Sequence, residues 1–221
     1  MGVRGVRWII AGWILLVAVG LLLAFGARGA GPLPGDLLSA RILQGLPWPG
    51  GVAGVLLSNA ESAVWLLLVI ALAVTLLSRR WLAALLVFVA TLIAVVMGQV
   101  LKMIVARPRP AAELVQVYDP SQDYGFPSTT ALISIVLFGV IAYLIWSEQP
   151  PRFVSIAALG IASALVVVIG LSRVYVGAHW LSDVLGGWLF GAAWLLLVVA
   201  AHRWLSRRGV SRNARKSRYL R

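Results

Sequence analysis

A histidine and an aspartate four residues apart are the first pair of side chains that could do chemistry. His179 and Asp183 stand at the expected start of a helix, where this spacing puts both on one face. The carboxylate can then accept a hydrogen bond from one ring nitrogen, which fixes the tautomer and makes the other nitrogen more basic. Such an imidazole can serve as a nucleophile or as a base. The second histidine, His202, is followed by Arg203 and Trp204 and is expected to be passive.

Four cationic side chains stand near the ends of two other expected helices. Lys102, Arg107 and Arg109 fall within eight residues, and Arg173 comes six residues before His179. Cations at a bilayer boundary are costly unless an anion compensates them. The alternative explanation is that these long side chains only extend to the membrane–water interface. Against it, the prolines on both sides of Arg109 fix the backbone and so the direction of the Arg109 side chain. The pattern therefore favours an anion-binding site.

A fourth expected helix begins with hydroxyl residues. Ser128, Thr129 and Thr130 follow Pro127, and Ser128 is a typical helix cap. The same helix start presents free backbone N–H groups and the positive end of the helix dipole, which together attract anions. We therefore treat all three as candidate phosphate ligands.

Together these residues predict a cationic pocket with one oriented imidazole. A tetrahedral dianion suits such a pocket, because Arg and Lys clamps neutralise the charge that phosphoryl transfer redistributes. An imidazole can attack phosphorus and form a covalent intermediate, which water then resolves.

The elements that carry these residues are expected to be membrane helices. The chain has 221 residues, of which 61% are hydrophobic and 12% charged, and it has no cysteine. Soluble proteins are about 25% charged, whereas a spanning helix needs about 20 mostly apolar residues. The predicted fold is all-α, an integral membrane bundle of six transmembrane helices in one domain over residues 1–204. The six apolar blocks are about 8–26, 62–78, 81–101, 128–146, 153–172 and 184–202.

The distribution of basic residues predicts the orientation of the bundle. Of 19 Lys and Arg residues, 13 fall on the side that holds both termini. Because short basic loops stay in the cytoplasm, both termini are expected inside and the candidate site on the extracytoplasmic side. Residues 205–221 form a basic tail that we expect to be disordered against anionic cytoplasmic lipid. Nucleic-acid binding is not expected, despite the net charge of +12.

The longest connection runs from residue 27 to residue 61 and is interrupted by Pro and Gly. Asp36 could cap a short helix whose apolar stripe (Leu38, Ile42 and Leu46) suits the membrane interface. We expect a connector, and a substrate-gating lid is the alternative.

Three motifs of this chain resemble the signature of the type 2 phosphatidic acid phosphatase (PAP2) superfamily. They are Lys102-x6-Arg109-Pro110, Pro127-Ser128 and Ser172-Arg173-x5-His179-x3-Asp183, within about 98–186. The resemblance implies a metal-independent and cofactor-free lipid phosphatase in a bacterial or archaeal plasma membrane. Lys102, Arg109, Ser128 and Arg173 would hold the phosphate. His179 would be the nucleophile and Asp183 its orienting partner.

One position departs from the family pattern. Thr130 stands where the family usually has a histidine that protonates the leaving oxygen. Without that acid, a lipid diphosphate becomes the favoured substrate, because its leaving group is a phosphate monoester that departs without a proton. A polyprenyl diphosphate is therefore expected, with phosphatidic acid and phosphatidylglycerophosphate as alternatives. A lipid-phosphate binder or transporter with little turnover, and a serine hydrolase that uses Ser128, are the other classes considered.

Overall fold

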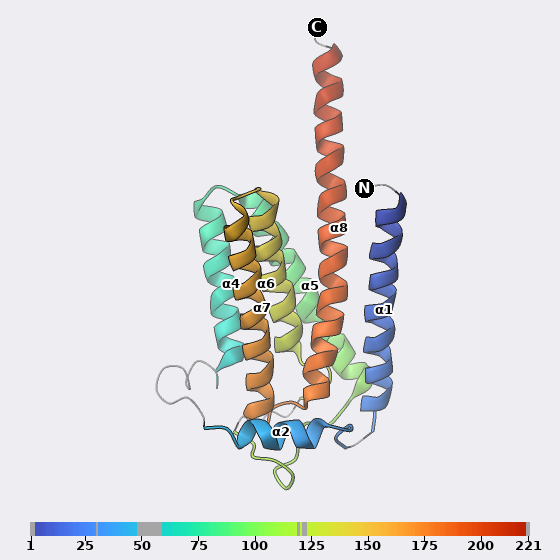
Figure 1. Ribbon diagram of the computed structural model, residues 1–221, viewed down its shortest axis with the longest axis vertical. Coiled ribbons are helices and arrows are strands. Elements are labelled where there is room, and N and C mark those ends of the chain that lie inside the picture. Colours follow the sequence, from blue (N-terminus) through green and yellow to red (C-terminus); the bar gives the residue numbers. More distant parts are fainter. Residues whose placement is uncertain (1–2, 30, 48–58, 119, 121–122, 220–221) are drawn as a thin grey trace.

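The protein is a bundle of α-helices in the computed structural model, which describes residues 3–29, 31–47, 59–118, 120 and 123–219 (Figure 1). The helices are α1 (Val3–Ala27), α2 (Asp36–Gln44), α4 (Ala60–Leu77), α5 (Trp81–Val105), α6 (Thr129–Ser147), α7 (Arg152–Tyr175) and α8 (Leu181–Tyr219). No strand occurs among the described residues. The predicted all-α class is confirmed.

Five of these helices are long and apolar enough to cross a membrane. They are α1, α5, α6, α7 and α8, and large apolar side chains such as Phe25, Leu82 and Phe153 are exposed on their outer faces. A bilayer accepts such faces, whereas water would not. The chain is therefore treated as an integral membrane protein. The expected span at 62–78 coincides with α4, whose described apolar stretch, Val64–Leu77, is shorter than a full crossing, so the count of six spans stays a prediction.

Helix α6 lies at the centre and contacts α4, α5, α7 and α8. Its approach to α8 depends on glycine. A Cβ on Gly187 would lie 2.5 Å from the Ser128 carbonyl oxygen, and one on Gly191 would lie 2.8 Å from that of Leu132. Small residues four apart let two membrane helices pack backbone to backbone. This contact brings the start of α8 against the start of α6.

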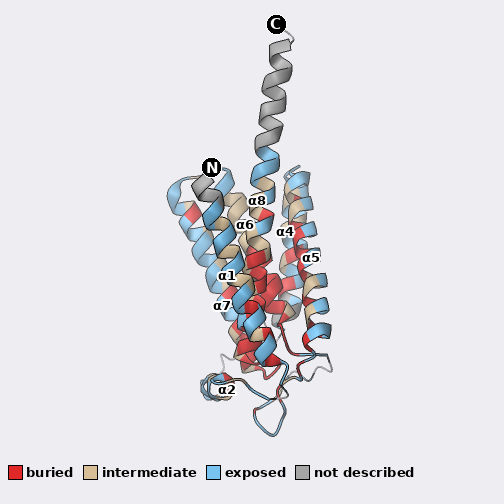
Figure 2. Ribbon diagram, turned by 90° about the vertical axis from the view of Figure 1, so that its right-hand side faces the viewer, coloured by how far each residue is buried: buried red, intermediate tan, exposed pale blue. Residues whose placement is uncertain are grey.

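The site residues and the chain ends lie at opposite ends of the bundle. Helix α2 crosses one end, and the described ends of α1 and α8 lie at the other (Figure 1). Buried residues concentrate toward the end that α2 covers (Figure 2). The location of either end relative to the cytoplasm stays a prediction.

Helix α2 forms where a short helix was expected, but Asp36 does not cap it. The capping residue is Gly35, in the left-handed conformation with φ 91°, and Asp36 is the first helical residue. Leu38, Ile42 and Leu46 are exposed along one stripe. Residues 48–58 of the long connection lie outside the described residues.

Helix α8 continues beyond the expected end of the last span. It runs to Tyr219 and so includes most of the basic segment that was expected to form a separate tail. The contact of that segment with anionic lipid stays a prediction.

Candidate active site

Two connections at the α2 end of the bundle, one between α5 and α6 and one between α7 and α8, position the site. Helix α5 ends at Val105 because Ala106 turns into the left-handed conformation, which directs the following Arg107 and Arg109 back toward the bundle. Between α7 and α8, Gly177 has φ 69°, and a Cβ there would lie 2.1 Å from the Gln116 carbonyl oxygen. Only glycine fits this close approach, so the turn that carries His179 depends on it.

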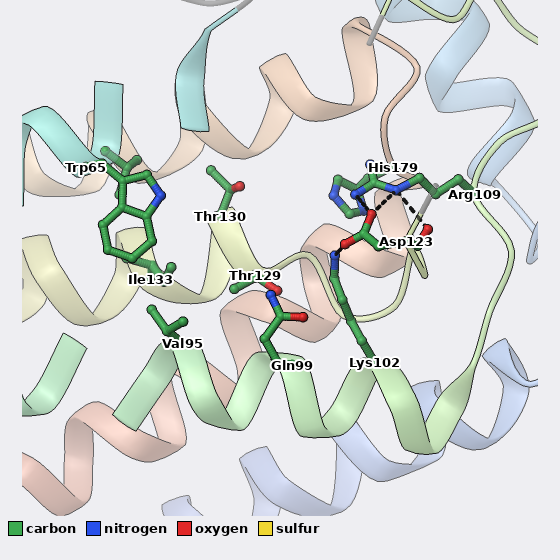
Figure 3. Close-up of a pocket in the computed structure, with 11 residues that line it drawn as sticks. Trp65, Val95, Gln99, Lys102, Arg109, Asp123, Thr129, Thr130, Ile133 and His179 are labelled. Carbon is green, nitrogen blue, oxygen red and sulfur yellow. Dashed lines mark hydrogen bonds and ion pairs between the residues drawn. The ribbon is translucent and has the colours of Figure 1, made fainter. Parts of the chain in front are cut away.

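A cavity of about 110 Å³ is lined by residues of α4, α5 and α6 and of the connections that follow α5 and α7 (Figure 3). Five of the predicted site residues line it, namely Lys102, Arg109, Thr129, Thr130 and His179. The other lining residues are Val64, Trp65, Val95, Gln99, Asp123 and Ile133. One end is thus charged and the other is apolar, with Thr130 between His179 and Trp65 in the view of Figure 3. This polarity suits a ligand with an anionic head and an apolar tail.

The ring of His179 is held in one tautomer. It is buried, and Nδ1 lies 2.8 Å from the Gly125 carbonyl oxygen. A carbonyl only accepts hydrogen bonds, so Nδ1 carries the proton and donates it. The lone pair is therefore on Nε2, which is the atom that a nucleophilic histidine needs.

Burial keeps this imidazole neutral. Desolvation lowers the pKa of His179 from 6.5 to about 4; the neighbouring Asp183 opposes this shift, and the nearby charges of Arg109 and Lys102 reinforce it. At neutral pH the ring is therefore an uncharged imidazole, the form that nucleophilic attack requires.

Asp183 lies next to this ring, but its hydrogen bonds go elsewhere. Its Oδ2 is 3.7 Å from His179 Nδ1, too long for a hydrogen bond, and accepts the Trp180 backbone N–H at 2.9 Å. Oδ1 accepts from Arg107 Nη1 at 2.5 Å. A direct hydrogen bond between Asp183 and His179 was expected, but His179 Nδ1 donates to the Gly125 carbonyl oxygen instead. The orienting role of Asp183 stays a prediction.

The two cations of the cavity are paired with a carboxylate that the sequence analysis did not single out. Asp123 accepts hydrogen bonds from Lys102 Nζ and from Arg109, whose Nε lies 2.8 Å from Oδ1 (Figure 3). Arg109 also donates to the Ala178 carbonyl oxygen at 2.8 Å, which ties it to the histidine turn. A carboxylate bound here shows that the two cations can hold an anion in common.

Ser128 and Arg173 lie beside the cavity and, within the described chain, are not among its lining residues. Ser128 is buried, its hydroxyl accepts from the Ala131 N–H at 3.4 Å, and its own N–H donates to the Asp183 carbonyl oxygen. The buried Arg173 accepts the Ala178 and His179 N–H groups at its carbonyl. The structure thus gives both a role in holding the site together, and their contact with phosphate stays a prediction.

Arg107 was grouped with the cations of the predicted anion-binding site and Asp36 was expected to cap a helix, but within the described chain neither residue lines the cavity. They form a buried ion pair at 2.9 Å beside Asp183. No signal could have revealed it, because the partners are 71 positions apart and belong to different patterns. His202 lies on α8 away from the cavity, with Nδ1 2.8 Å from the Tyr143 hydroxyl.

Comparisons with known proteins place the chain among lipid phosphatases by similarity. A family model described as PAP2 superfamily matches residues 81–207. An undecaprenyl-diphosphatase of Sulfolobus acidocaldarius is 40% identical over 107 residues, which cover 47% of this chain and 48% of the relative. Phosphatidylglycerophosphatase B of Bacillus subtilis is 34% identical over 108 residues, 46% of this chain and 49% of its own. The matched stretch spans about half the length of these curated relatives.

A solved structure shares the fold over most of its length. It is a transmembrane PAP2-type phosphatidylglycerolphosphate phosphatase from Bacillus subtilis, with a TM-score of 0.72 and 23% sequence identity. The match covers 86% of this chain and 96% of that one. The family model spans more than half of the 221 residues and includes all three motifs that gave the resemblance. The chain belongs to the PAP2 superfamily.

Proposed function

We propose that this protein removes the terminal phosphate from a lipid phosphate or diphosphate at the extracytoplasmic membrane surface. A single observation carries the proposal. One cavity joins the neutral His179 and the cations Lys102 and Arg109 to an apolar end at Trp65 and Ile133. A phosphorylated lipid needs both environments, since its head is anionic and its tail is not.

The reaction would proceed in two steps. The Nε2 lone pair of His179 attacks the terminal phosphorus while the bond to the bridging oxygen breaks, which gives phosphohistidine and a free lipid leaving group. Lys102 and Arg109, exchanging Asp123 for the phosphate, would neutralise its equatorial oxygens. Water then attacks the same phosphorus, releases orthophosphate and restores the imidazole.

Thr130 supports a diphosphate as the substrate. It lines the cavity and has no ionisable proton near neutral pH, and the sequence motif puts it where the family usually has its general-acid histidine. An alkoxide leaving group needs a proton, whereas a phosphate monoester with a last pKa of about 6 does not. The similarity to an undecaprenyl-diphosphatase favours the same substrate class, a polyprenyl diphosphate. Phosphatidic acid and phosphatidylglycerophosphate remain the alternatives, the latter because of the Bacillus subtilis relative.

The test compares orthophosphate release from a polyprenyl diphosphate and from the matched polyprenyl monophosphate, in detergent and without added metal. A general acid raises the reaction rate by a factor of about 10²–10⁴. The kcat/KM for the diphosphate should therefore exceed that for the monophosphate by a factor of about 10² or more. Thr130→His should raise the monophosphate value selectively. Equal wild-type values would contradict the leaving-group argument. Saturable lipid binding without release would instead support the binder or transporter.

The serine hydrolase has less support from the geometry. The Ser128 hydroxyl is buried in a helix cap at the start of α6. It is not among the lining residues of the cavity within the described chain. A serine nucleophile would need an exposed oxygen.

A further inference from the structure

A buried polar network joins α2 to the start of α8. The Asp36 carboxylate is buried and accepts the Ser182 backbone N–H at 2.8 Å and the Ser182 hydroxyl at 2.6 Å. It also accepts the Leu33 N–H at 2.8 Å. Ser182 is in the first turn of α8, where backbone N–H groups lack helical partners. Asp36 therefore binds the start of α8 from another helix.

Arg107 lies at the centre of this network, between two carboxylates. Its Nη1 donates to Asp183 Oδ1 at 2.5 Å and to the Ser182 hydroxyl at 2.7 Å. Its Nη2 donates to Asp36 Oδ2 at 2.9 Å and to the Gly31 carbonyl oxygen at 3.0 Å. The Arg107 side chain is 1% exposed, so water screens these contacts little.

The formal charge of this cluster matters for the ring beside it. Asp36, Arg107 and Asp183 together carry one net negative charge, and the Asp183 carboxylate lies 3.7 Å from His179 Nδ1. Phosphorylation of Nε2 leaves the ring protonated on Nδ1 and therefore cationic, in a place where burial disfavours a cation. If Asp36 were neutral, Arg107 would cancel the charge of Asp183, and the cationic ring would lose its counter-charge.

We propose that Asp36 is a positioning residue for phosphoryl transfer, which rests on the proposed function. Through Arg107 and Ser182 it fixes the Asp183 carboxylate and keeps the cluster beside His179 negative. Helix α2 thereby contributes to the reaction as well as to the packing of the bundle. The competing explanation is that Asp36 only fastens α2 to the bundle.

Two variants of α2 separate these explanations. Asp36→Asn keeps the shape of the side chain and removes its charge. Gln44→Ala is the matched control, because Gln44 also fastens α2, through the carbonyl oxygens of Gln116 and Tyr175 at 2.7 and 2.9 Å, without touching Asp183. Two quantities are measured for wild type and for each variant. They are the rate of phosphohistidine formation in a single turnover of a polyprenyl diphosphate, and the Kd for orthophosphate.

We expect Asp36→Asn to slow phosphorylation about 10- to 100-fold, as loss of a supporting hydrogen-bond partner at a reactive site does. Its Kd for orthophosphate should stay within about twofold, since Lys102 and Arg109 are untouched. Gln44→Ala should leave both the phosphorylation rate and the Kd for orthophosphate at their wild-type values. A wild-type phosphorylation rate in Asp36→Asn would overturn the proposal.

A second variant decides the outcome if Asp36→Asn fails to bind orthophosphate. Ser182→Ala removes the hydroxyl that Arg107 and Asp36 share. Slower phosphorylation with intact orthophosphate binding would support the proposal, and a wild-type rate would overturn it. Failure of the wild-type protein itself to form phosphohistidine would contradict the proposed function, and that result is visible before any variant is made.

Discussion

At the scale of single residues, the state of His179 decides whether the site can react. The ring is buried, donates from Nδ1 to a backbone carbonyl and keeps its lone pair on Nε2. Its pKa is lowered to about 4, first by desolvation. The imidazole is therefore neutral, with its one ring proton on Nδ1, across the physiological range of pH.

This state can be measured directly. In His202→Ala, His179 is the single histidine of the chain, and its ring can be titrated by NMR. Because burial disfavours the charged ring, protonation should begin only as the pH falls toward 4, well below the ordinary value of 6.5. A midpoint near 6.5 would show that the ring is solvated and would contradict the buried site.

We expect Asp123 to compete with phosphate, because its carboxylate is paired with Lys102 and Arg109, the two cations that a phosphate would need. An incoming phosphate must displace this carboxylate from Lys102 and Arg109. Asp123→Asn should therefore tighten orthophosphate binding about two- to fivefold, as expected for a partly exposed ion pair of about 0.5–1 kcal/mol.

The control for this prediction is Glu113→Gln, which removes an exposed negative charge from the same connection. It should leave the Kd for orthophosphate unchanged. Weaker binding in Asp123→Asn would mean that Asp123 organises the two cations for the phosphate.

At the scale of elements, the contact between α6 and α8 holds the start of α6, which lines the cavity, against the start of α8, which follows His179. A Cβ on Gly187 would meet the Ser128 carbonyl oxygen at 2.5 Å, whereas a Cβ on Gly160 of α7 would meet nothing within 4 Å. Gly187→Ala should cost about 1–3 kcal/mol of stability, the usual cost of overpacking. Gly160→Ala should cost none. Thermal unfolding in detergent checks the pair, and equal Tm values would rule out a tight α6–α8 contact.

Much of the arrangement of the helices, and of the site residues at their ends, could be predicted from the sequence. Spanning helices follow from the length of apolar runs, and Lys102, Arg109 and His179 gather because each comes at a helix end on the same side. The carboxylate partners could not be predicted, because Asp36 and Asp123 reach their cations through tertiary contacts. The bond of His179 to Gly125 also escaped prediction, since any carbonyl can accept and sequence spacing does not indicate which.

At the scale of the whole molecule, the end of the bundle that α2 crosses lies opposite the described ends of α1 and α8 (Figure 1), and the site is at the α2 end. The positive-inside bias predicts that the site faces outward. Since the chain has no cysteine, single cysteines can report the orientation. In intact cells, a membrane-impermeant thiol reagent should label Glu113→Cys and spare Ser206→Cys, both exposed positions. The reverse pattern would place the chemistry in the cytoplasmic leaflet.

The central claim is that His179 carries the phosphate. The most direct measurement is orthophosphate release from a polyprenyl diphosphate by purified wild type, His179→Ala and His202→Ala. Loss of a catalytic nucleophile lowers kcat roughly 10³-fold or more. The rate of release by His179→Ala should therefore fall by at least that factor. His202→Ala, which alters a residue away from the cavity, should keep the wild-type rate. Wild-type release by a folded His179→Ala would contradict the account.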